Sequence, residues 1–123
     1  MLYSSNDGAS EKIEIFFNEQ EVREYCKVVG RTYKGVVPSL MCAKVWPKFK
    51  LFQKFVQEDI LLVRTTCEEL ESLKCSLKYD AYLIHKSTRN FKKYVQYIYE
   101  LKINKDNRQC IFIRQTFIKI GGE

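Results

Sequence analysis

The stretch SLMCAKVWPKFKLFQKFV, residues 39–56, decides the fold of this chain. It is too apolar for a surface helix, with Leu40, Ala43, Val45, Trp46, Phe49, Phe52 and Phe55. Pro47 lacks a backbone N–H and must end or kink a helix near Trp46. We therefore predict a buried central helix from about Ser39, followed by a turn and a second short helix or irregular apolar segment.

The residues before this stretch predict one strand and one amphipathic helix. Ile13–Phe17 is a short strand, and Asn18 is a good N-cap with Glu21 at the capping-box position. The helix Glu19–Val29 ends at Gly30, a residue typical of the position after a helix. Its apolar face carries Val22, Tyr25, Cys26 and Val29. Residues 1–12 are polar and are expected to form a flexible segment.

The second half of the chain predicts strands. They cover Leu61–Leu70, Lys78–Ser87, Lys93–Ile103 and Gln109–Ile120. Residues 105–108 form a turn around Asp-Asn and join the last two strands as a hairpin. We expect the four strands to follow one another in a meander. The fold class is then α+β, a single domain over residues 13–120 with a mostly antiparallel sheet.

The charge of the chain is positive and unevenly distributed. The net charge is +6 over 123 residues, and residues 25–57 and 81–99 contain no acid. The basic residues of these stretches are Lys27, Arg31, Lys34, Lys44, Lys48, Lys50 and Lys54, then Lys86, Arg89, Lys92 and Lys93. Either this is a chance distribution in a basic protein, or it is a positive surface for phosphates.

Cysteine and histidine usage argues against a metal site. The five cysteines have no CxxC spacing and the chain has one histidine, so we expect no metal, no cofactor and reduced thiols. The first ten residues lack the pattern of a signal peptide, and no apolar run has the length of a membrane span. The sequence thus predicts a cytoplasmic protein that does not bind membranes.

Several motifs, in order, resemble one protein family. FFNEQEVREYCKVVGR (16–31), VVPSL (36–40), LLVRTTCEELESLKCSLKYDAYLIHKS (61–87) and the terminal hairpin are similar to segments of MaoC-like hydratases and dehydratases. They also resemble the N-terminal, non-catalytic type of fatty-acid-synthase-type dehydratase domain. The resemblance spans about residues 13–120. It implies a hot-dog fold, in which the sheet wraps around the central helix, and a role in fatty-acid metabolism.

The resemblance also implies where catalysis would occur. Catalytic family members carry an Asp and a His in a D-x-N-P-x-H loop before the central helix, which supplies the acid and base of the reaction. Here the same interval is GRTYKGVVPSL (30–40), without Asp, Glu, His or Asn. His85 and Asp80 lie in one predicted strand on opposite faces, so they do not replace the pair. We expect no catalytic residue of the usual kind.

What remains is a site that could bind an acyl thioester of coenzyme A or of an acyl carrier. The start of the central helix offers free N–H groups, and nearby basic residues suit phosphates. The candidate ligand-binding residues are Arg31, Tyr33, Lys34, Pro38, Ser39 and Lys44, with Lys48, Lys50, Lys54 and the Lys92–Lys93 pair as further cations. Hot-dog domains usually pair edge to edge, which implies a homodimer or a heterodimer with a catalytic hot-dog subunit. A catalytically degenerate MaoC-like protein is our leading interpretation.

Two other interpretations stay open. The chain could be an active dehydratase, hydratase or thioesterase with a non-standard site, although Ser39 has no His/Asp relay and Glu58 and Asp59 read as surface acids. It could also be a basic nucleic-acid-binding or regulatory protein, since its predicted sheet is rich in aromatic residues. We rank nucleic acid below the acyl thioester as a partner.

Overall fold

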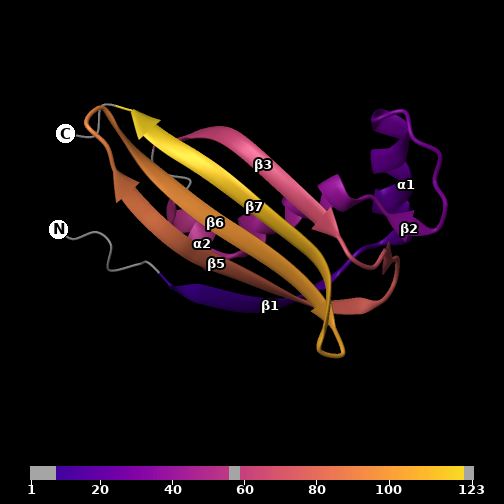
Figure 1. Cartoon of the computed structure of the whole chain (residues 1–123). Helices are drawn as coiled ribbons and strands as arrows, with labels where there is room; N and C mark the ends of the chain where they lie inside the picture. The colour runs from indigo at the N-terminus through magenta and orange to yellow at the C-terminus, as the bar shows by residue number, and fades with distance from the viewer. Residues whose placement is uncertain (1–7, 56–58, 121–123) are drawn as a thin grey trace.

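The fold is built on one five-stranded antiparallel sheet (Figure 1). The computed structural model describes residues 8–55 and 59–120, with Leu40 and Lys54 described by their backbone alone. The strand order is β1-β5-β6-β7-β3. The strands are β1 (Ser10–Phe16), β5 (Lys78–Asn90), β6 (Tyr94–Lys105), β7 (Arg108–Ile120) and β3 (Leu61–Glu69). The predicted α+β class and antiparallel sheet are confirmed.

The apolar stretch forms two helical segments that run along one face of the sheet (Figure 1). They are the 3₁₀ helix η2 (Ser39–Lys48) and the α-helix α2 (Lys50–Phe55), so the predicted start at Ser39 and the second short helix are confirmed. Pro47 lies inside η2 and cannot supply the N–H that an α-helical bond would need. The break falls at Phe49, whose backbone is extended.

The first helix, α1 (Glu19–Val28), stands at one end of the sheet (Figure 1). The predicted cap is confirmed, because Asn18 Oδ1 accepts the N–H of Gln20 at 2.7 Å and of Glu21 at 3.4 Å. At the other end Gly30 has φ +73°, and the N–H of Arg31 reaches the carbonyl of Cys26 at 2.8 Å. This is the Schellman arrangement that the position of Gly30 predicted.

The predicted meander is wrong. β3 pairs with β7 at one edge of the sheet, and β1 takes the place beside β5. After β3 the chain forms a short strand, β4 (Leu73–Lys74), which pairs with β2 (Val36–Val37) in a second, two-stranded sheet. After this ladder the chain enters β5, which lies between β1 and β6 on the far side of the sheet from β3. Alternation of apolar residues sets the buried face of a strand but not its neighbour.

The predicted turn of the terminal hairpin and the predicted start of the first strand can both be compared with the structure. Asp106 and Asn107 have φ of 51° and 66°, as a tight hairpin turn requires, so the predicted turn is confirmed. β1 begins at Ser10, three residues before the predicted strand and inside the segment expected to be flexible. Residues 1–7 of that segment lie outside the described residues.

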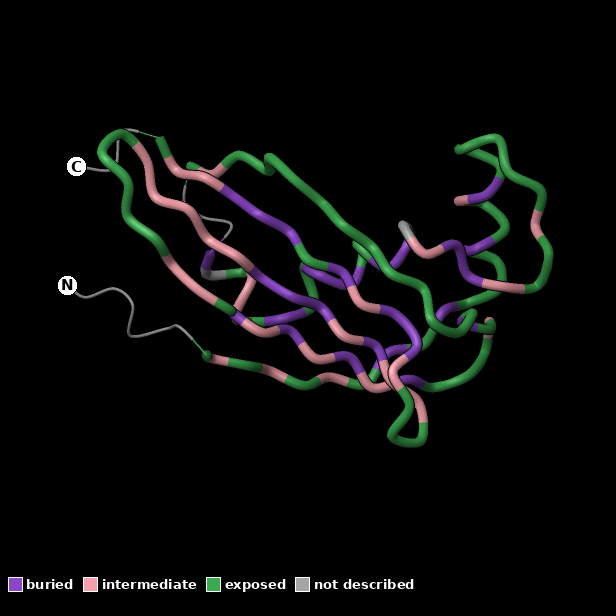
Figure 2. The backbone as a smooth tube through the Cα atoms, viewed as in Figure 1, coloured by how far each residue is buried: buried purple, intermediate pink, exposed green. Residues whose placement is uncertain are grey.

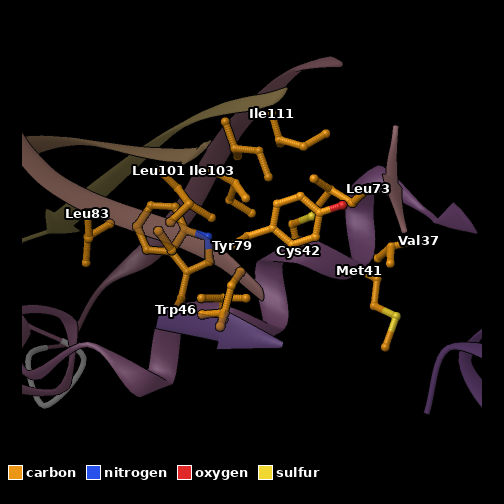
Figure 3. Packing of buried hydrophobic residues seen from close by; sticks show 14 of the residues in the cluster. Val37, Met41, Cys42, Trp46, Leu73, Tyr79, Leu83, Leu101, Ile103 and Ile111 are labelled. Carbon is orange, nitrogen blue, oxygen red and sulfur yellow. The ribbon is translucent and has the colours of Figure 1, made fainter. Parts of the chain in front are cut away.

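The core lies between the inner face of the sheet and the two helical segments (Figures 2 and 3). Sheet residues Ala81, Leu83, Leu101, Ile103 and Ile111 are fully buried there, opposite Cys42, Trp46 and Phe49. In β5 the buried residues alternate from Tyr79 to His85, the period expected for a strand with one covered face. Across the described residues, no helix has the length and apolar content to cross a membrane.

Candidate functional site

The loop between α1 and η2 borders a pocket of about 200 Å³. The pocket is lined by Cys26, Arg31, Thr32, Lys34, Val36 and Pro38. Arg31 and Lys34 are exposed at its rim, whereas Pro38 is buried and precedes the first residue of η2. Three of the predicted ligand-binding residues therefore share one concave, positively charged surface. None of its lining residues is an acid.

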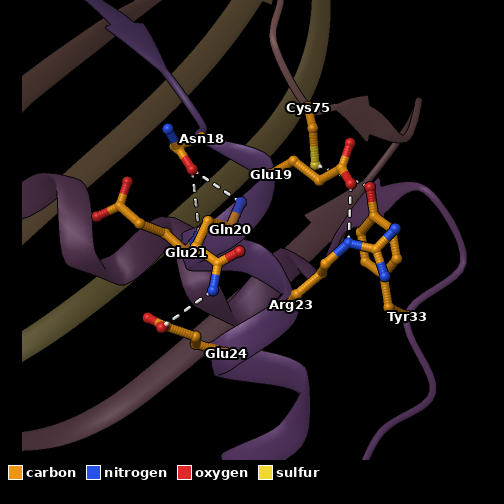
Figure 4. Close-up of polar contacts among 8 residues, drawn as sticks. All are labelled: Asn18, Glu19, Gln20, Glu21, Arg23, Glu24, Tyr33 and Cys75. Atoms are coloured by element: carbon orange, nitrogen blue, oxygen red, sulfur yellow. Dashed lines mark hydrogen bonds and ion pairs between the residues drawn. The ribbon is translucent and has the colours of Figure 1, made fainter.

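Tyr33, also predicted as a ligand-binding residue, contacts other residues of the chain (Figure 4). Its hydroxyl donates to Cys75 Sγ at 3.5 Å, and the guanidinium of Arg23 lies 4.3 Å from the centre of its ring. Glu19 in turn accepts from Arg23 at 2.8 Å. The bond to Cys75, followed by desolvation, raises the pKa of Tyr33 to about 12. These contacts fasten the loop to α1 and to the turn after β4.

Ser39 meets a carboxylate that the sequence did not single out. The Ser39 hydroxyl donates to Glu69 Oε1, and the Ser72 hydroxyl donates to Glu69 Oε2 at 2.9 Å. Glu69 ends β3, and the strand places it against the first residue of η2. An acid therefore stands at the start of the central helix, thirty residues away in sequence. The only sequence signal for it was that alternation in β3 puts Thr65, Cys67 and Glu69 on one face.

Two thiols lie close to this contact. Cys42, on η2, is fully buried, and burial raises the pKa of its thiol to about 12, with a smaller contribution from Cys67. Cys67 is exposed on β3, and desolvation followed by the charge of Glu69 raises its pKa as well. Both shifts favour the protonated thiol over the thiolate, the form in which a cysteine acts as a nucleophile.

The remaining predicted cations do not form one group. Lys44, Lys48 and Lys50 are exposed along the helical layer, and Lys44 Nζ lies 5.7 Å from the ring centre of Tyr25. Lys92 and Lys93 lie in the β5–β6 turn, next to Tyr94, which pairs with Ile120. Glu69, which contacts Ser39, pairs with Ile111 of β7. Ile111 lies nine residues before Ile120 along the same strand, and at the rise of a strand this is a distance of about 30 Å. The Lys92–Lys93 pair is thus at the opposite end of the sheet from Ser39.

The single histidine is a core residue. His85 is buried and stacks on Tyr99 with ring centres 4.6 Å apart, and its Nε2 lies 2.8 Å from the Thr88 hydroxyl. Asp80 points to the other face of β5, where it is half-exposed near Lys12 at 3.9 Å. The predicted separation of the two residues is confirmed. No set of three or more His, Cys, Asp or Glu within the described segments could hold a metal ion.

Comparison with known structures places this architecture among hot-dog proteins. The C-terminally truncated HadBC (3R-hydroxyacyl-ACP dehydratase) complex from Mycobacterium tuberculosis aligns with a TM-score of 0.80 at 13% identity, over 95% of this chain and 99% of that one. An (R)-hydratase from A. caviae involved in PHA biosynthesis gives 0.72 at 10% identity, over 97% and 99%. The ChsH1-ChsH2 complex from Mycobacterium tuberculosis gives 0.69 at 8%, over 92% and 85%. The chain has the hot-dog fold of MaoC-like dehydratases, as predicted.

Sequence comparison identifies the family. The profile of the uncharacterised conserved protein VraC matches residues 2–121, and the chain belongs to the VraC family. Protein VraC of Staphylococcus haemolyticus is 48% identical over 122 residues, which are 99% of this chain and 97% of that protein. VraC of Staphylococcus epidermidis is 39% identical over 87% of this chain and 89% of the relative. VraC of Staphylococcus aureus is 27% identical over 90% and 92%.

Proposed function

We propose that the chain is a catalytically degenerate MaoC-like hot-dog protein that binds an acyl thioester of coenzyme A or of an acyl carrier. The observation that carries this proposal is the composition of residues 30–40. They occupy the interval before the central helix, where the family resemblance implies an Asp and a His, and they contain neither. Hydration or dehydration of a thioester needs an acid and a base beside the substrate, and this interval supplies none.

The pocket beside this loop supports binding of a phosphate-bearing carrier. Arg31 and Lys34 place two cations at its rim, while Val36 and Pro38 give it an apolar wall. An acyl thioester on a phosphopantetheine arm combines phosphate charges with apolar segments, so both kinds of surface are needed. The residues that line the pocket include these two cations and no acid.

Assembly with another hot-dog domain fits the same proposal. The structural neighbours HadBC and ChsH1-ChsH2 are complexes named for two components each. In a complex of two such subunits, a chain without the catalytic Asp and His would shape the acyl site. Without such a partner it would bind its ligand and not turn it over.

Two measurements on the purified chain test the proposal. Crotonyl-CoA should show no hydration above background, while butyryl-CoA should bind in isothermal titration calorimetry. Arg31→Ala and Lys34→Ala should each weaken that binding severalfold, because each removes a charge that meets phosphate. The matched control is Lys92→Ala, at the other end of the sheet, which should bind as the unmodified chain does. Turnover of crotonyl-CoA, or no binding of butyryl-CoA at millimolar concentration, would refute the proposal.

Glu69 favours a second candidate function, thioester hydrolysis. Its carboxylate lies at the start of η2 against Ser39, where a thioester carbonyl would approach the helix N–H groups. As a general base it would take a proton from water while the water oxygen bonds to the carbonyl carbon. The C–S bond would then break, and the proton would pass from Glu69 to the leaving sulfur, giving a carboxylic acid and a free thiol.

This alternative has its own readout. Release of free coenzyme A from butyryl-CoA, followed with a thiol reagent, should be seen if Glu69 acts as the base. Glu69→Gln should then lose the activity, and Glu71→Gln should keep it because Glu71 is paired with Arg108 at 3.3 Å instead. Equal thiol release by the unmodified chain, by Glu69→Gln and by a buffer blank would exclude hydrolysis at this site.

A further inference from the structure

Two cysteines lie between the central helical layer and the edge strand β3. Cys67 pairs with Ile113 of β7, and residues directly opposite each other in a sheet point to the same side. Ile113 is a core residue, so Cys67 lies on the inner face of the sheet, which the helical segments cover. Cys42 belongs to η2 and is fully buried in the same core (Figure 3). Both residues are free thiols.

The contact between Ser39 and Glu69 brings the two cysteines level with each other. Cys67 lies two residues before Glu69 on the same face of β3, a distance of about 7 Å along the strand. Cys42 lies three residues after Ser39, and side chains at this spacing in a 3₁₀ helix eclipse each other about 6 Å apart along the axis. Figure 1 shows that η2 and β3 run in opposite directions. Starting from the contact of Ser39 with Glu69, steps of similar length along the two elements therefore end at Cys42 and Cys67.

The electrostatics of the two thiols agree with this placement. Burial raises the pKa of Cys42 most, and the groups that raise it further are Cys67 and then Glu69. Burial and then Glu69 raise the pKa of Cys67, whereas a hydrogen bond with Ser39 lowers it in part. The two thiols are thus within electrostatic reach of each other, and Ser39 contacts both Glu69 and Cys67.

We propose that Cys42 and Cys67 form a disulfide when the protein is exposed to a peroxide, and that this bond ties η2 to β3. A disulfide joins residues whose Cα atoms are about 4–7 Å apart. Residue pairs of η2 and β3 have Cα atoms within 8 Å of each other, so the two backbones approach closely enough for such a bond. The other cysteines lie on different elements, with Cys26 in α1, Cys75 after β4 and Cys110 in β7.

The reaction balances with the two thiols as the reductant. Cys67 is the exposed thiol and reacts first: its sulfur bonds to one peroxide oxygen, the O–O bond breaks, and the leaving hydroxide takes up the thiol proton to form water. The Cys42 sulfur then bonds to the sulfenic sulfur of Cys67 and the S–O bond breaks. The second hydroxide takes up the proton of Cys42. Two thiols thereby lose two electrons, and hydrogen peroxide is reduced to two molecules of water.

The raised pKa values make this a response to sustained oxidation. Thiolate is the reactive form and is scarce at neutral pH in both residues, so the link should form slowly there. Once formed, it closes the loop of residues 42–67 and restricts the unfolded chain, which stabilises the folded state. The link needs no acyl thioester and is measured without one, so it stands or fails apart from the proposed function.

Peroxide treatment of the full chain, purified with its thiols reduced, tests the pairing. After incubation with hydrogen peroxide at pH 8.5, digestion without reductant should give a linked pair of peptides that contain Cys42 and Cys67. Its mass should be about 2 Da below the sum of the two thiol peptides, because two hydrogens are lost. The oxidised protein should run as a single chain on a denaturing gel without reductant, and its urea midpoint should be higher than that of the reduced protein. Dithiothreitol should reverse both changes.

Substitutions of exposed or partly exposed cysteines supply the controls. Cys67→Ser should abolish the linked peptides and the rise in the urea midpoint. Cys75→Ser is the matched control and should keep both, since Cys75 is also accessible in part but lies after β4. Four outcomes would each overturn the proposal: no disulfide after prolonged exposure, a link from Cys67 to a different cysteine, a disulfide between two chains, or further oxidation of Cys67 while Cys42 stays a free thiol.

Discussion

The carboxylate of Glu11 accepts the backbone N–H of Leu51 at 2.8 Å and that of Lys50 at 3.1 Å. A residue of the first strand thus caps a helix that begins about forty residues later. α2 has only six residues and no acid of its own in its first turn, so it depends on such outside partners. The contact joins the edge strand β1 to the helical layer.

Glu11→Ala should lower the free energy of unfolding by about 1 kcal/mol, the usual cost of removing a cap that satisfies helix N–H groups. Urea denaturation followed by circular dichroism measures the change. Glu14→Ala is the matched control, because Glu14 lies on the exposed face of the same strand, 3.9 Å from Lys78. Equal effects of the two substitutions would show that Glu11 does not cap α2.

The fold could be predicted where a local signal exists. Asn18 and Gly30 bounded α1, Pro47 located the break after η2, and Asp106-Asn107 fixed the last turn. Each of these acts within a few residues, through a side-chain hydrogen bond, a missing N–H or a left-handed backbone. The neighbours of β3 and β1 depend on contacts across the whole chain. The β2–β4 ladder is only two residues long on each side, which leaves no period to read.

Part of the arrangement around the candidate site could be read from the sequence. The loop composition around Arg31 and Lys34 pointed to the surface that the pocket occupies. The contact of Ser39 with Glu69 was missed, because it depends on the register of β3 against β7 and on the path of η2. Tyr33 is one of the predicted ligand-binding residues, but in the structure its hydroxyl donates to Cys75. Hydrogen-bond partners distant in sequence cannot be read from spacing.

An ion pair on the outer face of the sheet, with one buried partner, gives the second prediction. Arg114 Nε donates to Glu100 Oε2 at 2.9 Å, and the Glu100 side chain is 5% exposed whereas that of Arg114 is 46% exposed. Arg114→Leu should cost about 2–4 kcal/mol, since it leaves a buried carboxylate uncompensated. The double variant R114L/E100L should recover most of that loss, and urea denaturation of the four proteins measures the coupling. Additive losses in the double variant would mean that the two side chains do not interact.

The thiols give the third prediction. At pH 8 iodoacetamide should modify Cys67 well before Cys42, because Cys67 is exposed whereas Cys42 is fully buried and its pKa is raised to about 12. Mass spectrometry of the labelled peptides reads out each site. Denaturing the protein first should make the two rates similar, which controls for intrinsic reactivity. Faster labelling of Cys42 in the native protein would contradict its placement in the core.

The raised pKa of Cys42 also predicts how stability responds to alkali. Burial raises the pKa of this thiol from 9.0 to about 12, so the folded state holds the proton more tightly than the unfolded state. Its contribution to stability is complete below about pH 9 and is lost as the pH rises toward 12. Urea midpoints measured from pH 8 to 10.5 should fall with pH. Cys42→Ala should show a shallower fall, and an identical slope in both proteins would exclude this thiol as a cause.

Trp46 provides the last prediction, because it is the only tryptophan and lies in the core. It is 2% exposed, and its ring centre lies 5.2 Å from that of Phe52 and 6.4 Å from that of Phe117. Its fluorescence should be blue-shifted in the native protein and shift to the red on unfolding.

Substitutions of Trp46 separate its packing from its polar group. Trp46→Ala should cost about 3–5 kcal/mol through the cavity it leaves. Trp46→Phe should cost much less, because it keeps an aromatic ring and removes a buried indole N–H that has no hydrogen-bond partner among the described residues. Urea unfolding followed by circular dichroism compares the two. If Trp46→Phe and Trp46→Ala lowered the free energy of unfolding equally, the indole N–H would have to make a hydrogen bond. That hydrogen bond would then be worth more than the packing that phenylalanine preserves.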